Sequence, residues 1–148
     1  MANIVPYSFP VELLKGNHDF VNDTYTISLY TTLGAYSTAS TVYDATGEVS
    51  SGGGSQYAAQ ALTGNAVSNV ANYATVDFTP DPVWGSPTPA TFSALGAAIY
   101  NTSDANKLVV VLDFGATFSC SNGTFTVTFP APTAGTPSGA DALLSINS

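Results

Sequence analysis

A short polar stretch near the N-terminus holds the residue types most able to do chemistry. It reads GNHDFVNDTYTISLY, residues 16–30, and contains His18, the only histidine of the chain, beside Asp19 and Asp23. Imidazole and carboxylate groups bind metals and transfer protons. A zinc site needs three or four ligands, however, and there is no second histidine. We therefore predict that the Asn and Asp side chains of this stretch hydrogen-bond nearby backbone amides in turns.

Other catalytic arrangements have little support in the sequence. Cys120 is the single cysteine, far in sequence from the one imidazole that would activate it, and we expect it to be a small apolar residue in a strand. The nucleophile motif GxSxG is absent. Paired carboxylates for glycoside cleavage come from distant strands, so that alternative stays open. We predict no enzymatic activity, no metal site and no bound cofactor.

The charge composition limits the class of partner. Two lysines and no arginine stand against ten carboxylates, which gives a formal net charge of −8. Nucleic acids and anionic membranes are bound through cationic side chains, so neither is expected to be a partner. The longest apolar run, LVVVL at 108–112, is too short to cross a bilayer. No basic segment followed by an apolar run opens the chain, and we therefore expect no secretory signal.

The polar stretch connects two short elements. Before it, FPVELLKG is typical of one or two helical turns, with Pro10 near the start and Gly16 at the end. After Asp23 the apolar residues recur with a period of two. This alternation, Tyr25, Ile27 and Leu29, predicts a half-buried strand.

Further strands are expected near 56–62, 70–78, 91–102, 107–120 and 124–129, the last two joined by a hairpin at Asn122–Gly123. The run LVVVL predicts a strand covered on both faces. Many short strands with turns between them indicate an all-β protein, an antiparallel β-sandwich or jelly-roll-like fold. We assign residues 1–133 to this domain, including an N-terminal arm at 1–9, and 134–148 to an extended C-terminal tail.

Aromatic and apolar residues near the ends of the chain and in a proline-rich loop are the candidate partner contacts. Tyr and Trp bury a large area while keeping a polar group, which suits protein interfaces. Arms add affinity by multiple attachment. The predicted contact residues are Tyr7, Phe9, Trp84, Leu143, Leu144 and Ile146.

Three segments, taken in order, carry a resemblance to a known group of proteins. They are FPVELLKGNHDFVNDTYTISLYT, TVYDATGEVSSGGG and KLVVVLDFGATFSCSNGTFTVTFP. Their order and spacing are similar to those of small virion structural proteins of tailed bacteriophages. The resemblance covers most of residues 9–130. It departs at GGGSQY, where those proteins often have GGGY, and the tail 134–148 is unmatched.

The resemblance implies a structural protein made in the bacterial cytoplasm and located in the virion. Within that group it is most like capsid decoration, or cement, proteins, which bind the major capsid protein on the outer capsid surface as dimers or trimers. Two alternatives remain. One is a tail-fibre or baseplate component for host attachment. The other is a carbohydrate-binding β-sandwich module that would use Trp84 and exposed tyrosines as stacking platforms.

Overall fold

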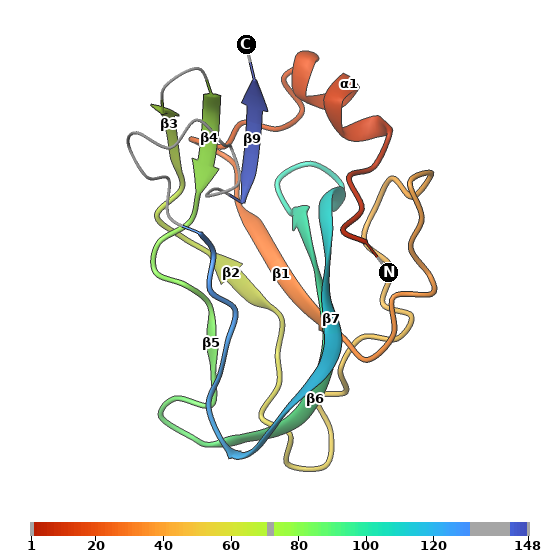
Figure 1. Cartoon of the computed structure of the whole chain (residues 1–148), viewed down its shortest axis with the longest axis vertical. Helices are drawn as coiled ribbons and strands as arrows, with labels where there is room; N and C mark the ends of the chain where they lie inside the picture. Colours follow the sequence, from red (N-terminus) through yellow and green to blue (C-terminus); the bar gives the residue numbers. More distant parts are fainter. Residues whose placement is uncertain (1, 71–72, 131–142, 148) are drawn as a thin grey trace.

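The computed structural model describes residues 2–70, 73–130 and 143–147 and has an all-β architecture with one short helix (Figure 1). The elements are α1 Ser8–Leu14, β1 Tyr25–Tyr30, β2 Gln60–Leu62, β3 Ala66–Val70, β4 Tyr73–Asp77, β5 Val83–Trp84, β6 Ala90–Asn101, β7 Lys107–Gly123, β8 Phe125–Thr126 and β9 Leu144–Asn147.

All strand pairs are antiparallel, and they form three sheets. The largest has the order β2-β1-β6-β7, a second has the order β3-β4-β9, and β5 pairs with β8. The sheets pack together around a shared apolar core, as in a β-sandwich. The predicted all-β antiparallel sandwich is therefore confirmed, while the jelly-roll connectivity stays a prediction.

The largest sheet is buried on both faces where β1, β6 and β7 meet. On one face, Tyr25, Ile27 and Leu29 of β1 belong to a core cluster that also contains residues of β4 and β5. On the other face, Tyr30 packs with Leu33 of the loop that follows β1. The predicted alternation of β1 is thus correct, but the strand is covered on both sides. The strand containing LVVVL is buried on both faces as expected.

Tyrosine hydroxyl groups hold the long loop 31–49 against the second face. The Tyr30 hydroxyl donates to the carbonyl of Asp44 (2.7 Å) and lies 2.8 Å from the Tyr36 hydroxyl. The Tyr57 hydroxyl donates to Glu48 Oε1 at 2.6 Å, and burial together with this carboxylate raises the pKa of Tyr57. These three tyrosines are buried and are not available to a partner.

One strand was not predicted, and one hairpin prediction is wrong. The strand expected near 70–78 is present as β4, and it pairs with β3, which the sequence did not predict. The expected hairpin at Asn122–Gly123 does not fold back on β7. The chain crosses instead to the other side of the sandwich, where β8 pairs with β5.

The two predicted arms are largely part of the sandwich. At the C-terminus, β9 joins the edge of β4, and Leu143 and Leu144 pack against the core, so this end of the tail does not project freely (Figure 1). Residues 131–142 of the predicted tail lie outside the described residues. At the N-terminus, Ile4 exchanges two backbone hydrogen bonds with Val111 of β7, at 2.8 and 2.9 Å.

Candidate functional site

The single helix, α1, is apolar on two opposite faces. Phe9 and Leu13, four residues apart, point to the core. Tyr7, Val11 and Leu14 have the spacing i, i+4 and i+7, which places them together on the outer side. A helix of seven residues is not stable alone, so the inner face must anchor it.

A stack of aromatic rings provides the anchor. The Phe9 ring lies 5.0 Å from the His18 ring and 6.3 Å from the Phe20 ring, measured between centroids. Phe20 in turn stacks on Tyr25 of β1 at 4.7 Å. Phe9 and Phe20 are both buried, so α1 is fixed to the largest sheet through a continuous aromatic contact.

His18 lies inside this stack and contacts Glu12. Its Nε2 is 3.3 Å from Glu12 Oε2, while its Nδ1 is buried without a hydrogen-bond partner among the described residues. Burial lowers the pKa of His18, and the neighbouring Glu12 carboxylate opposes that effect only in part. His18 is therefore a neutral member of the stack at pH 7, with Nε2–H donating to Glu12.

This arrangement predicts a pH-dependent stability. An unfolded histidine has an ordinary pKa of 6.5, and the folded pKa is lower. Below pH 6.5 the unfolded state therefore binds more protons, and the free energy of unfolding falls as the pH falls. We expect the melting temperature to drop more between pH 7.5 and 5.5 for the wild type than for His18→Gln. Equal drops in the two proteins would contradict a buried neutral imidazole.

The rest of the polar stretch forms turns, as predicted. Asp19 Oδ1 accepts from the backbone amides of Val21 (2.9 Å) and Asn22 (3.1 Å). Asp23 Oδ2 accepts from the amide of Asp19 (2.9 Å) and from Asn101 Nδ2 (2.7 Å). These bonds connect the turn to the end of β6, so the stretch positions α1 against the sheet.

The outer face of α1 carries the most concentrated exposed apolar surface of the described chain. Five of the nine large apolar side chains that are exposed lie within residues 5–21. Tyr7 is 74% exposed, Val11 51% and Leu14 90%. Pro10 is also exposed and lies between them on the same face. We call Tyr7, Pro10, Val11 and Leu14 the α1 stripe.

No comparable arrangement of reactive groups appears elsewhere. Within residues 2–70, 73–130 and 143–147, no three His, Cys, Asp or Glu side chains are grouped closely enough to hold a metal ion. None of the helical structure in those ranges is long and apolar enough to span a bilayer. Cys120 lies in β7 and packs partly against the core, as expected for a small apolar residue.

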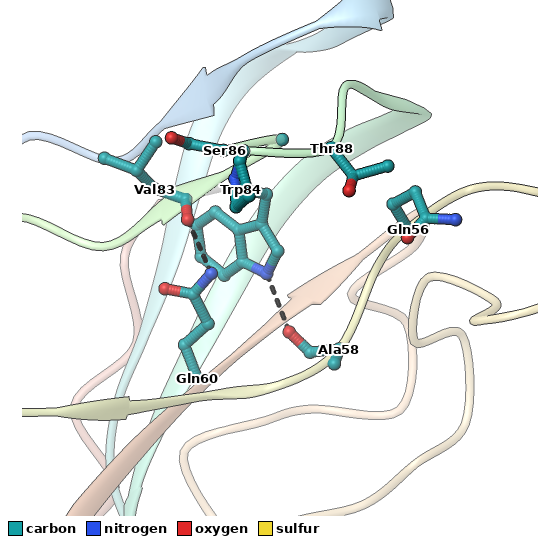
Figure 2. A pocket seen from close by; sticks show the side chains of 9 residues that line it. Gln56, Ala58, Gln60, Val83, Trp84, Ser86 and Thr88 are labelled. Carbon is teal, nitrogen blue, oxygen red and sulfur yellow. Dashed lines mark hydrogen bonds between the residues drawn. The ribbon is translucent and has the colours of Figure 1, made fainter.

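The prediction that Trp84 contacts a partner is wrong. Trp84 is 2% exposed, and its indole N–H donates to the carbonyl of Ala58 at 2.7 Å (Figure 2). A hollow of about 240 Å³ borders it, lined mainly by polar groups such as Gln56, Ser86 and Thr88. The indole ring packs into the core with Tyr57 and has no open face on which a sugar could stack.

The other predicted contact residues have different positions. Tyr7 is exposed as expected, whereas its neighbour Phe9 is 3% exposed and belongs to the core, because the helix turns it inward. Leu143 and Leu144 are partly buried against the core. Ile146 pairs through its backbone with Ala74 of β4. Of the six, only Tyr7 contributes to the α1 stripe.

Sequence reasoning did not identify Val11 and Leu14 as exposed. The run FPVELLKG predicts one or two helical turns, but that prediction did not say which side faces the core. The signal for a second face was present, because Phe9 and Leu13 share one helical spacing while Tyr7, Val11 and Leu14 share another. In the folded chain one of these faces packs on the core and the other is exposed.

Comparison of the chain with protein-family models, with curated proteins and with solved structures returned no match.

Proposed function

We propose that the protein is a structural component of a tailed-bacteriophage virion that binds major capsid protein subunits and decorates the outer capsid surface. The observation that carries the proposal is the α1 stripe, four apolar residues side by side on a helix that is anchored from beneath. The assignment to a virion rests on the resemblance of the three ordered segments described above.

The stripe has the properties of a protein contact. Exposed apolar groups that gather in one place on a soluble protein mark interaction sites more often than the same residues scattered singly. Tyr is enriched among the residues that dominate binding energy. The stripe contains no carboxylate, although the chain carries ten, so a partner meets no buried charge there.

The anchor beneath the stripe favours binding further. Phe9, His18 and Phe20 hold α1 in place before any partner arrives. A surface that is already ordered loses less conformational entropy on association than a flexible arm does. The attachment we propose is therefore a fixed helical face, in place of the extended arms expected from the sequence.

Cosedimentation with expanded capsids tests the proposal. Val11→Asp puts a charge in the stripe and is expected to weaken capsid binding about thirtyfold or more, the effect of losing a dominant contact. Val83→Asp is the control, because Val83 is also exposed (38%) but lies on β5, outside the stripe and its anchor. The control is expected to bind as the wild type does.

Other outcomes would contradict the proposal. A wild-type protein that does not associate with capsids would reject capsid decoration, and cryo-electron microscopy that locates it in the tail would favour host attachment. Equal losses for Val11→Asp and Val83→Asp would keep the capsid as partner but remove α1 as the contact.

A further inference from the structure

The outer edge of β7 is paired in its first half and open in its second. Along the first half, Ile4 bonds to Val111, and the amide of Leu108 donates to the carbonyl of Thr41 at 3.0 Å. Beyond Gly115, β7 continues to Gly123 and pairs with β6 on one side only. No other strand of the described chain pairs with residues 116–121, so a row of backbone donors and acceptors faces outward.

This open edge lacks two of the features that keep sheet edges apart. Natural edge strands are usually blunted by charged side chains, prolines, bulges or a covering element. Residues 114–129 contain no charged residue and no proline. The pairing with β6 shifts between Asp113 and Phe118 and again between Cys120 and Gly123, and it is regular at Phe118, Ser119 and Cys120 between the two shifts. The six residues of 116–121 are a usual length for a paired strand.

The side chains on each face of the segment suit contact with the same face of a second copy. On the core side, Phe118 is 53% exposed beside Phe114, and the two ring centroids are 6.4 Å apart. They border a hollow of about 460 Å³ that is also lined by residues 124–128. Thr117, Ser119 and Ser121 carry hydroxyl groups, which both donate and accept hydrogen bonds. The Ser119 hydroxyl lies 2.6 Å from that of Ser93 in β6, whereas Thr117 and Ser121 are exposed.

We propose that residues 116–121 of β7 pair antiparallel with the same segment of a second copy, which joins the two largest sheets into one continuous sheet. A two-fold axis perpendicular to the sheet keeps equivalent faces on the same side. The two Phe118 side chains then lie near each other over the core-side hollows, and the hydroxyl rows meet on the other face.

Charge allows a second copy at this edge. Each chain carries a net charge of −8, so two copies repel each other except where their carboxylates are far from the contact. The segment 114–130, which contains this edge, is uncharged, so two copies can approach each other here. β7 runs from the end of the molecule that carries α1 to the opposite end, so a dimer through 116–121 leaves both α1 stripes open (Figure 1). The inference does not depend on the capsid proposal.

Sedimentation equilibrium of the full chain tests the dimer. We expect a wild-type mass of about twice 15.1 kDa that dissociates on dilution. Thr117→Lys places two like charges at the junction and is expected to weaken dimerisation about tenfold or more. Ala61→Lys, on the opposite edge of the same sheet, is the control and is expected to dimerise as the wild type does. Thermal melts establish that both variants fold.

Cysteine cross-linking gives an independent readout of the same contact. In a Cys120→Ser background, Thr117→Cys, Ser119→Cys and Ala61→Cys are oxidised in turn. We expect a cross-linked dimer for at least one of the two β7 positions and none for Ala61→Cys. A wild-type protein that stays monomeric up to about 1 mM, far above the Kd of a specific dimer, overturns the inference. The inference is also overturned if Thr117→Lys leaves the dimer intact and neither β7 cysteine gives a cross-linked dimer.

Discussion

Replacing Trp84 with alanine is expected to lower the free energy of unfolding by about 3–5 kcal/mol, the usual cost of removing a large buried aromatic side chain. Trp84 lies between Tyr57 and Phe125, at ring distances of 6.4 and 6.2 Å. Its loss opens a cavity and leaves the carbonyl of Ala58 without its donor. Urea denaturation measures the effect. The slope of the free energy of unfolding against urea concentration is expected to stay unchanged.

A neighbouring residue provides the control for Trp84. Val83 lies in the same two-residue strand and is 38% exposed, so Val83→Ala is expected to cost about 0.5 kcal/mol or less. Trp84→Phe keeps most of the ring volume but not the N–H, and an intermediate loss of about 1–3 kcal/mol is expected. A Trp84→Ala protein as stable as the wild type would contradict the buried position of the indole.

The result also bears on carbohydrate binding. A sugar-stacking tryptophan is exposed in the free protein, so its replacement removes binding while leaving stability nearly unchanged. A buried tryptophan gives the opposite pattern. Because Trp84 is 2% exposed, the carbohydrate alternative loses one of its predicted stacking platforms and keeps only exposed tyrosines such as Tyr7.

The parts of the fold that could be predicted are those fixed by local periodicity. The alternation of Tyr25, Ile27 and Leu29 and the apolar run 108–112 both predicted strands that the structure contains. The parts that could not be predicted depend on pairing between distant segments. The dipeptide Asn122–Gly123 has hairpin chemistry, yet the chain that follows it pairs with the distant strand β5 and not with β7. Sequence shows the turn, and only the folded chain shows which strand lies beyond it.

The candidate site shows the same division. Turn chemistry around Asp19 could be predicted, because an Asp side chain bonds amides two and three residues away whatever the rest of the fold does. The direction of α1 could not, because Phe9 and Val11 are equally apolar in sequence. Which face of the helix turns inward is decided by the rings of His18 and Phe20, which meet Phe9 only in the folded chain.

Phe9 and Tyr7, two residues apart, are expected to respond to alanine in opposite ways. Phe9→Ala removes the anchor of α1 and is expected to cost about 3–5 kcal/mol in the free energy of unfolding. Tyr7→Ala removes a side chain that is 74% exposed and is expected to cost about 0.5 kcal/mol or less. Urea denaturation of both variants measures the difference.

Capsid binding and hydrogen exchange then separate the anchor from the contact. Tyr7→Ala is expected to weaken capsid binding while the amides of Lys15 and Asn17, which bond to the carbonyls of Val11 and Glu12, stay protected. Phe9→Ala is expected to weaken binding too, but with faster exchange at those amides, because a helix of one or two turns does not persist without its packing. Fast exchange in both variants would mean that Tyr7 also holds the helix. Slow exchange in both would mean that the turns, and not the aromatic stack, keep α1 in place.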